Sequence, residues 1–328
     1  MAYWQGRRVL VTGAYGFLAS HLIESLLQGG AVVTGLVRDH PAESYLQLTG
    51  LDSRITLMSG DVTDLEFCRR ALNEEEIQVV FHLAAQALVG LANRSPLSTF
   101  ESNIRGTYIL LEACRELIAD RSPLEAIVVA SSDKAYGDQK RLPYSEEAPL
   151  LGLHPYDASK ACADILTRAF AGTYGLPAAV TRCANLYGPG DLNFSRIVPA
   201  TFQALLMGQR PIIRSDGSPQ RDYLLVRDAV SGYLAVAESV VAGEAAGQAF
   251  NLGTGRPVTV LELVREIIEV VGVDLEPEVL GTASSEIIHQ YLDASRAQRT
   301  LGWRAATSLH DGLAVTHDWY RGYVRAHV

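Results

Sequence analysis

The sequence predicts an α/β fold in which helices cover both faces of a parallel sheet. Short runs rich in Val, Ile and Ala recur along the chain, and amphipathic stretches of helical period lie between most of them. A glycine-containing turn follows the first run and precedes the first of these helical stretches. With 328 residues, of which 48% are hydrophobic and 20% charged, the chain can bury a large core. Together these observations indicate a doubly wound fold.

The runs that we interpret as buried parallel strands are apolar, short and bounded by polar residues. They cover residues 8–12, 31–37, 55–59, 79–84, 126–130, 178–184 and 248–252. Helices are predicted over residues 17–28, 65–72, 103–117 and 158–174.

A second, smaller lobe is predicted where this alternation stops. After Gly188 the residues Gly, Pro and Arg cluster through "GPGDLNFSRIVPA" and "RPIIRSDGSPQRDYLLVRDA", and a polar, helix-rich stretch follows from about Val258. We therefore expect a dinucleotide-binding domain over 1–187 plus about 222–254. The remaining residues, 188–221 plus about 255–328, would form a discontinuous substrate-binding lobe.

Charge and cysteine usage exclude several classes of protein. Lys and Arg number 28 against 37 Asp and Glu, a net charge of −9, which disfavours a nucleic-acid partner. The cysteines lie far apart in the sequence and suggest neither a metal site nor a disulfide framework. No run has the length of a membrane span or the order of a signal peptide. We expect a cytoplasmic protein that does not contact membranes.

The turn after the first strand carries the first functional motif. In "VTGAYGFLASHL" the small residues Gly13, Gly16 and Ala19 have the spacing G-x-x-G-x-x-A. Small residues let the backbone turn tightly and approach a pyrophosphate, which then lies at the N-terminus of the helix. This context predicts a Rossmann dinucleotide site.

The end of the second strand bears on the choice of cofactor. Leu36 falls near the place where an NAD enzyme commonly has a carboxylate, and Arg38 and Asp39 follow it. Arg38 favours NADP if it contacts a 2′-phosphate, whereas Asp39 favours NAD if it reaches the ribose. The sequence leans towards NADP.

Two further segments are predicted to contact the cofactor. Asp61 and Val62 follow the third strand and are placed to meet the adenine, although Asp61 has the alternative of capping the next helix. The segment "HLAAQ", residues 82–86, follows the fourth strand and is placed to line the cofactor site.

A proton relay is predicted from two motifs. In "YDASK", Tyr156 and Lys160 stand four residues apart and share one helix face. A nearby ammonium and a cationic nicotinamide favour the phenolate, and with Ser132 alongside the group can oxidise a secondary alcohol. The alternative is an ordinary surface pair.

Asp133 and Lys134 follow Ser132 directly after the fifth strand, in "SSDKAYG". Ligands of open α/β sheets bind at this edge, so the pair is a candidate for chemistry. The alternative is an exposed turn ion pair that contributes little to stability.

Taken in order, these motifs resemble the extended short-chain dehydrogenase/reductase family, specifically nucleotide-sugar epimerases and dehydratases. "RCANLYGP" and the tail "YLDASRAQRTLGW" extend the resemblance over nearly the whole chain. The Asp-Lys pair and "HLAAQALV" are most similar to CDP-glucose 4,6-dehydratases, and "GLVRD" is similar to GDP-mannose 4,6-dehydratases.

The resemblance implies a role for each matching residue. The expected catalytic residues are Ser132, Asp133, Lys134, Tyr156 and Lys160. The expected NAD(P)-binding residues are Gly13, Tyr15, Gly16, Phe17, Leu18, Arg38, Asp61, Val62, Leu83, Ala84, Ala85, Tyr156 and Lys160. The expected contacts to a nucleotide-diphosphate sugar are Gln86, Asn185, Arg196 and Arg221, with a structural ion pair as the alternative for either arginine.

The implied reaction is a nucleotide-sugar 4,6-dehydration in which NAD(P) is restored to its starting form. Tyr156 would take the proton of the C4 hydroxyl, Lys134 the proton of C5, and Asp133 would protonate the departing C6 hydroxyl. The alternatives are a 4-epimerase, a 4-keto reductase, or an inactive dinucleotide-binding protein. The resemblance also implies a homodimer that pairs through the helices over 103–117 and 158–174.

Overall fold

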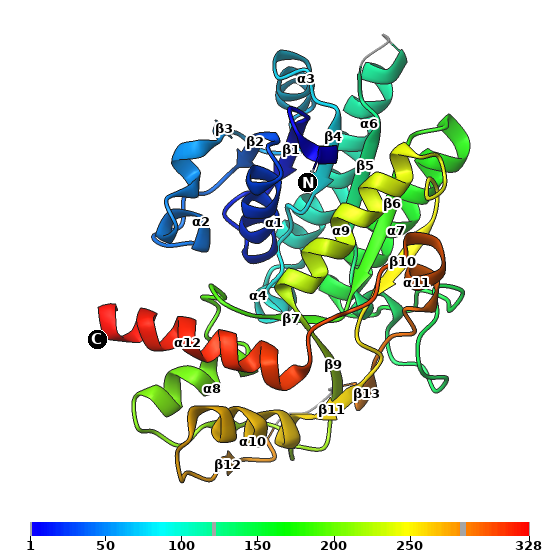
Figure 1. The fold of residues 1–328 in the computed structure, drawn as a ribbon. Helices are drawn as coiled ribbons and strands as arrows, with labels where there is room; N and C mark the ends of the chain where they lie inside the picture. The colour runs from blue at the N-terminus through cyan, green and yellow to red at the C-terminus, as the bar shows by residue number, and fades with distance from the viewer. Residues whose placement is uncertain (1, 120–122, 283–286, 328) are drawn as a thin grey trace.

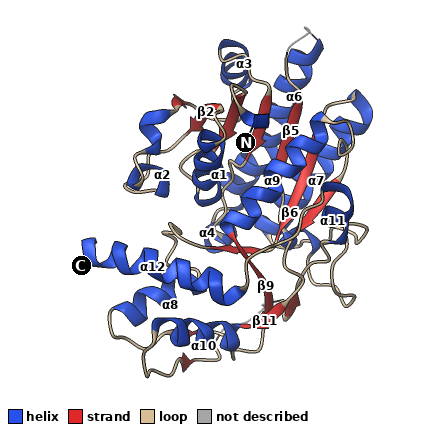
Figure 2. Cartoon of the chain, viewed as in Figure 1, coloured by secondary structure: helices blue, strands red, loops and turns tan. Residues whose placement is uncertain are grey.

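A computed structural model describes residues 2–119, 123–282 and 287–327 of the chain. Within these residues, seven parallel strands form one sheet in the order β3-β2-β1-β4-β5-β6-β10, with helices on both faces (Figures 1 and 2). The strand order reverses between β1 and β4, and this is the point where ligands of such sheets bind. The doubly wound prediction is confirmed.

The strands of this sheet coincide with the seven predicted runs. The largest difference is at β4, predicted over 79–84 and observed over Val79–His82. The strands are β1 (Arg8–Thr12), β2 (Val32–Val37), β3 (Thr56–Ser59), β4 (Val79–His82), β5 (Ala126–Ala130), β6 (Ala178–Cys183) and β10 (Ala249–Leu252).

The helices also begin and end close to their predicted limits, except that the helix expected over 103–117 starts with a π-helical turn, η3 (Glu101–Arg105). The helices are α1 (Phe17–Gln28), α2 (Tyr45–Leu48), α3 (Leu65–Glu74), α4 (Val89–Arg94), α5 (Pro96–Phe100), α6 (Gly106–Ala119), α7 (Pro155–Tyr174), α8 (Ile197–Leu206), α9 (Val226–Val241), α10 (Val260–Val271), α11 (Ser295–Leu301) and α12 (Leu309–His327). The 3-10 turns are η1 (Ala2–Trp4), η2 (Leu51–Arg54) and η4 (Asp133–Tyr136).

Both faces of the central strands are buried, which explains why these strands are mainly apolar rather than alternating. In β1, Val9 and Val11 belong to the core that includes residues of α1 and α9, whereas Leu10 belongs to the core that includes residues of α3 and α6. Successive side chains of a strand point to opposite faces, so each face receives its own hydrophobic layer.

The rest of the chain builds a smaller region below the sheet in Figure 1. Strand β9 pairs with β7, β11 and β13, and β8 pairs with β12. Side chains of β9, α8, α10 and α12 form a separate core, in which Phe202 and Tyr320 are fully buried. Helix α11, within the part predicted to belong to the smaller lobe, instead packs on α9 and β10. The strands of this region are β7 (Asn185–Tyr187), β8 (Ile212–Ile213), β9 (Gln220–Leu225), β11 (Pro257–Thr259), β12 (Glu278–Val279) and β13 (His289–Gln290).

Candidate functional site

The turn after β1 is shaped for the close approach of a phosphate group. Gly13 has φ +71°, and a Cβ atom on it would lie 2.9 Å from Cα of Ala84. Gly16 precedes α1 as its N-cap residue, so no N-cap side chain accepts hydrogen bonds from the first-turn N–H groups of this helix. Helix N-termini of this kind bind anions, so Gly13 and Gly16 fit a dinucleotide pyrophosphate.

Gly13→Ala is expected to weaken dinucleotide binding about tenfold or more, because the new methyl group displaces the backbone at Ala84. The dinucleotide retained by the purified protein measures this effect. Gly6→Ala is the matched control. Gly6 has a similar φ of +74°, but a Cβ atom added to it would have no other atom within 4 Å. Equal retention in the two variants contradicts the assignment of Gly13.

A chain of buried hydroxyl and imidazole groups holds the strands at this point. The Thr12 hydroxyl oxygen accepts hydrogen bonds from the N–H groups of Leu83 and Ala84, and it lies 2.9 Å from Nδ1 of His82. Nε2 of His82 lies 3.1 Å from the Thr107 hydroxyl. Burial, together with the charge of Lys160, lowers the pKa of His82 to about 3. His82 therefore supports the site as a neutral residue.

The free energy of unfolding is expected to decrease by about 2 kcal/mol between about pH 7 and about pH 5 through His82 alone. The pKa of His82 is depressed in the folded chain, so the unfolded chain binds the extra proton below its ordinary pKa of 6.5. Urea unfolding at both pH values checks this, and His82→Gln is expected to show a smaller decrease. The same pH dependence in both proteins contradicts the prediction.

Arg38 lies at the end of β2, where its guanidinium is surrounded by hydrogen-bond acceptors. Its Nε donates to Asp39, its Nη1 donates to Ser102 at 3.0 Å, and Asp61 lies 3.9 Å from Nη1. The side chain of Arg38 is half-exposed. The carbonyl oxygen of Leu36 accepts the N–H groups of the glycine turn, so this residue shapes the turn through its backbone.

Asp61 does not cap the helix that follows it, so this alternative is wrong. The N-cap of α3 is Asp64, whose Oδ1 accepts the N–H groups of Glu66 and Phe67. Asp61 instead accepts the N–H group of Thr63 at 2.9 Å.

The other residues expected to bind the cofactor lie on the same edge of the sheet. Tyr15 packs its ring edge-on against His40, and Phe17 and Leu18 begin α1. Val62 is buried beside Gly106. The segment with Leu83, Ala84 and Ala85 follows β4 directly and faces the glycine turn.

Tyr156 and Lys160 lie in the first two turns of α7, which starts at Pro155, a residue favoured at this position of a helix. Burial raises the pKa of Tyr156 to about 12. The charge of Asp133 adds to this, and a hydrogen bond with Ser132 opposes it. Burial lowers the pKa of Lys160 to about 8, and its Nζ donates to the carbonyl oxygen of Ala130 at 2.8 Å. The structure thus brings Ser132, Tyr156 and Lys160 together.

Asp133 and Lys134 do not form an exposed turn ion pair, so that alternative is also wrong. Asp133 is 2% exposed, and its Oδ1 accepts a hydrogen bond from the Ser132 hydroxyl. Its other oxygen, Oδ2, is buried and has no hydrogen-bond partner among the described residues. Lys134 donates instead to Oε1 of the buried Gln290 at 3.2 Å. A buried carboxylate without a full set of partners requires an explanation beyond folding.

The residues expected to bind substrate have different surroundings. Asn185 in β7 donates to the Asp222 carbonyl oxygen, and the side-chain amide of Gln86 donates to Leu88 in its own loop. Arg196 pairs with the buried Asp191 at 3.0 Å, so the ion-pair alternative is present for this arginine. Arg221, by contrast, donates to backbone carbonyl oxygens and has no ion-pair partner within the described ranges.

Two residues of this site were missed by the sequence analysis. Asn103, in the π-helical turn, donates to the Gln86 carbonyl oxygen and to Ser159, and accepts the N–H group of Gln86. It thereby fixes the loop after β4 against α7. Gln290 comes from β13, far away in the sequence, and its Nε2 is also buried without a described partner. A helix that changes to π-helical geometry often marks such a site, but the sequence did not reveal the change.

Comparisons with known proteins agree with this geometry. Residues 9–253 match the model of the "NAD dependent epimerase/dehydratase family". The chain is 31% identical to the CDP-glucose 4,6-dehydratase of Salmonella typhimurium, covering 98% of this chain and 93% of that protein. It is 34% identical to the UDP-glucose 4-epimerase of Mycolicibacterium smegmatis, covering 96% and 98%.

A solved relative resembles the whole fold. The dTDP-glucose 4,6-dehydratase DesIV of Streptomyces venezuelae, solved with NAD bound, superposes with a TM-score of 0.84 at 30% identity, covering 96% of this chain and 97% of that one. With its glycine turn, its Ser-Tyr-Lys group and these matches, the chain belongs to the NAD dependent epimerase/dehydratase family of extended short-chain dehydrogenases/reductases.

Proposed function

We propose that this protein is a nucleotide-sugar 4,6-dehydratase that converts an NDP-hexose to the NDP-4-keto-6-deoxyhexose and water. One observation carries the proposal: a buried acid, Asp133, and an amine, Lys134, adjoin the Ser132–Tyr156 relay. Oxidation at a single carbon needs only the relay. The added pair gives the site an acid and a base for elimination.

The residues fit a bound NAD(P), because Gly13 and Gly16 leave room for its pyrophosphate and Tyr156 and Lys160 meet at the same edge of the sheet. A bound NAD(P) would supply hydride chemistry, accepting a hydrogen with its electron pair from C4 and giving it back at C6, so that the cofactor would end unchanged.

In the first step, Tyr156 accepts the proton of the C4 hydroxyl. The high pKa of Tyr156 arises from burial and from the charge of Asp133, so the positive charge of a bound nicotinamide beside the phenol would favour the phenolate. The hydrogen bond from Nζ to the Ala130 carbonyl oxygen holds the Lys160 side chain in place.

In the second step, the C4 ketone makes the C5 hydrogen acidic, and Lys134 in its neutral form removes it as a proton. Asp133 donates its proton to the C6 hydroxyl, which leaves as water while the C5–C6 double bond forms. The hydrogen from C4 would return to C6, and the Lys134 ammonium gives its proton back to C5, which completes the 4-keto-6-deoxy sugar. The proton taken by Tyr156 restores Asp133 through the Ser132 hydroxyl, which contacts both groups. Gln290 holds the Lys134 amine at the site, and the partnerless Oδ2 of Asp133 is available to the leaving group.

The proposed substrate is a nucleotide-diphosphate sugar. An acidic protein must supply positive charge locally for a diphosphate, and the guanidinium of Arg221 makes only backbone hydrogen bonds among the described residues. We assign Arg221 and Arg196 to the nucleotide and diphosphate, and Asn185 and Gln86 to the sugar side. The relatives named above act on nucleotide sugars, which supports this class.

For the cofactor we propose NADP, with Arg38 as the residue that binds the 2′-phosphate. The half-exposed guanidinium at the end of β2 supports this proposal. Mass spectrometry of the dinucleotide released by denaturing the purified protein tests it. NAD as the released dinucleotide contradicts the choice of NADP and leaves the dehydratase proposal intact.

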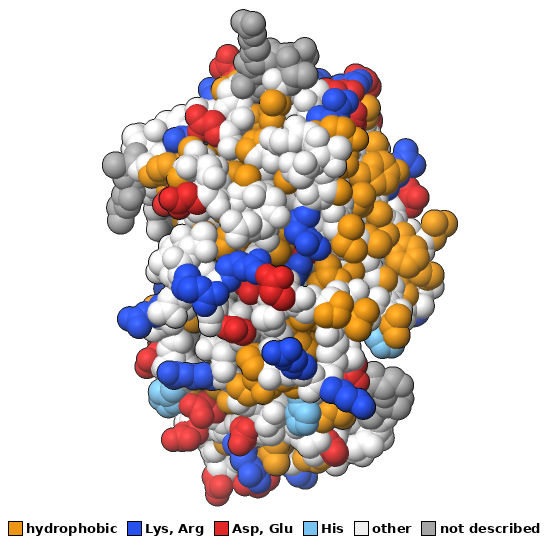
Figure 3. All heavy atoms as spheres, turned by 90° about the vertical axis from the view of Figure 1, so that its right-hand side faces the viewer, with side chains coloured by type: hydrophobic (Ala, Val, Ile, Leu, Met, Phe, Trp, Pro, Cys, Tyr) orange, Lys and Arg blue, Asp and Glu red, His pale blue; other side chains and the backbone are white. Residues whose placement is uncertain are grey.

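We further propose a cytoplasmic homodimer that pairs through α6 and α7. These helices and the preceding α5 expose the apolar residues Leu97, Tyr108, Ile165 and Tyr174, and Figure 3 shows hydrophobic side chains gathered along one side of the face it views. No described helix has the length and apolar character needed to cross a membrane. Light scattering tests the dimer by measuring the molar mass of the wild type and of Ile165→Lys. The lysine introduced into the apolar face is expected to dissociate the dimer into monomers.

The experiment that tests the activity is mass spectrometry of purified protein incubated separately with CDP-glucose, GDP-mannose, dTDP-glucose and UDP-sugars, without added reductant. Loss of one water from one substrate supports the proposal and names the sugar. An isomer of unchanged mass contradicts it and favours the 4-epimerase. Turnover only with added reduced cofactor favours a 4-keto reductase, and binding without turnover favours an inactive dinucleotide-binding protein.

A further inference from the structure

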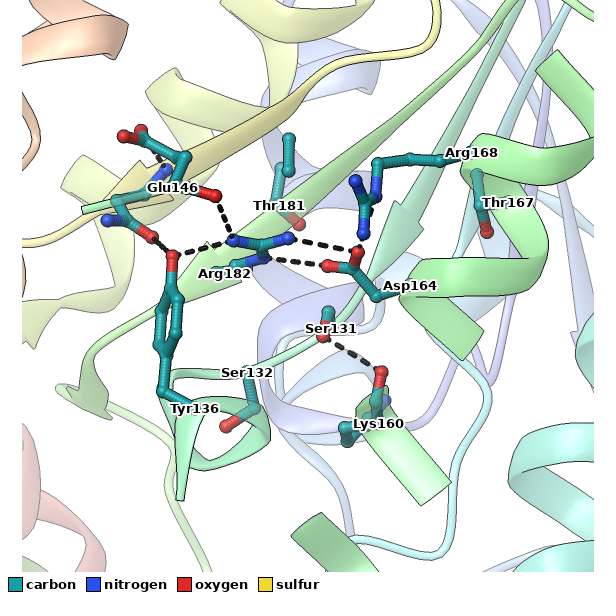
Figure 4. Close-up of polar contacts among 12 residues, drawn as sticks. Ser131, Ser132, Tyr136, Glu146, Lys160, Asp164, Thr167, Arg168, Thr181 and Arg182 are labelled. Atoms are coloured by element: carbon teal, nitrogen blue, oxygen red, sulfur yellow. Dashed lines mark hydrogen bonds and ion pairs between the residues drawn. The ribbon is translucent and has the colours of Figure 1, made fainter. Parts of the chain in front are cut away.

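A buried ion pair next to the proposed site joins β6 to α7. Arg182 in β6 is 1% exposed, and its Nε and Nη2 donate to the two carboxylate oxygens of Asp164 at 2.7 and 3.0 Å. Figure 4 shows the guanidinium between Asp164 on one side and Tyr136 on the other. Such a two-bond pair fixes the orientation of both groups as well as their distance.

The other side of Arg182 holds the turn η4. Its Nη1 donates to the Tyr136 hydroxyl at 2.7 Å and to the Glu146 carbonyl oxygen at 3.2 Å, and the guanidinium carbon lies 4.9 Å from the centre of the Tyr136 ring. The Tyr136 hydroxyl in turn donates to the buried Asn251 at 2.7 Å. Tyr136 is thus held at its tip by hydrogen bonds on both sides.

These contacts connect the two segments that carry the proposed chemistry. Tyr136 is the last residue of η4, whose first two residues are Asp133 and Lys134. Asp164 follows Lys160 by one helical turn of α7 and Tyr156 by two, so the three share one face. A single guanidinium therefore connects the turn with the acid and base to the helix with the proton relay.

We propose that Arg182 is a positioning residue that sets Asp133 and Lys134 at the correct distance from Tyr156 for elimination. This inference rests on the dehydratase function proposed above. In that reaction, groups from the turn and from the helix must reach three neighbouring carbons of one sugar, and a shift of about 1 Å lowers such rates strongly. Oxidation at C4 by Ser132, Tyr156 and Lys160 makes no such demand on Asp133 and Lys134.

A role in stability alone does not account for this arrangement well. Buried ion pairs are often no better for stability than well-packed apolar residues, because both charges must be desolvated. However, a buried ion pair whose polar atoms are all hydrogen-bonded does fix a unique geometry. The two roles predict different kinetics: a positioning role slows elimination more than oxidation, whereas a purely structural role reduces both equally.

The test compares Arg182→Met and Tyr136→Phe with the wild type, using substrate deuterated at C4 or at C5. Arg168→Met is the control, because Arg168 also pairs with Asp164 but is 41% exposed and contacts that carboxylate from its own helix. Thermal unfolding identifies variants that fold. If Arg182→Met does not fold, the comparison is made with Tyr136→Phe, which removes only one hydroxyl group.

We expect kcat for water loss to fall about 100-fold in Arg182→Met and about tenfold in Tyr136→Phe, with KM within about twofold of the wild type. The isotope effect of C5 deuterium should rise and that of C4 deuterium should fall. Unchanged isotope effects, or an equal loss in Arg168→Met, overturn the inference. A wild type that releases no water overturns the proposed function itself, so the two failures are distinguishable.

Discussion

Replacing Tyr156 by Phe is expected to lower kcat/KM about 1,000-fold, because every later step depends on the removal of the C4 hydroxyl proton. The substitution removes one oxygen from a residue in the first turn of α7 and leaves the ring in place. Burial raises the pKa of this phenol to about 12, so the hydroxyl oxygen is the group through which Tyr156 would accept the proton. Steady-state assays of product release measure the effect.

The control for this variant is Tyr174→Phe, which removes the same atom from the last residue of the same helix, where the side chain is 59% exposed. Full activity is expected there. If Tyr156→Phe retains more than about a tenth of the wild-type rate, Tyr156 is not the base that opens the reaction.

Replacing Lys134 by Met is expected to lower the rate of water loss about 100-fold or more, since the site then lacks the base that removes the C5 proton. Because Ser132, Tyr156 and Lys160 do not depend on this side chain, C4 oxidation should continue. Mass spectrometry of the product measures water loss. Asp133→Asn is expected to give a similar loss, because the amide keeps the shape of the acid but has no acidic proton to donate.

Lys140→Met serves as the matched control, since this lysine follows in the same loop and is exposed. It should behave as the wild type. Unimpaired water loss in Lys134→Met means that another group removes the C5 proton, and the assignment of the Asp-Lys pair then fails.

Much of the fold could be predicted from local pattern. The run 126–130 is short, apolar and bounded by polar residues, which favours a strand buried on both faces, and its limits are those of β5. The smaller region was predicted less well, because its strands are only a few residues long and pair with segments distant in sequence. Gln290 pairs in β13 with Arg221 of β9, and nothing in the local pattern of either segment indicates the other.

The candidate site could be predicted where its residues form motifs and not where they act through burial. Tyr156 and Lys160 are four residues apart, so the helix alone brings them together. Asn103, Arg182 and Asp164 come from three elements, and their functions depend on hydrogen bonds that only the folded chain makes. Lys134 itself was predicted, but its partner Gln290, which lies in the smaller region, was not.

The most direct test of the central claim follows a deuterium atom through one turnover. A substrate that loses water in the panel experiment is prepared with deuterium at C4 and incubated with the protein in ordinary water. We predict a product lighter by one water that carries the deuterium at C6, because the hydrogen removed from C4 returns within the same site. Deuterium found at C4 of an isomer of unchanged mass, or lost to solvent, contradicts the dehydratase assignment.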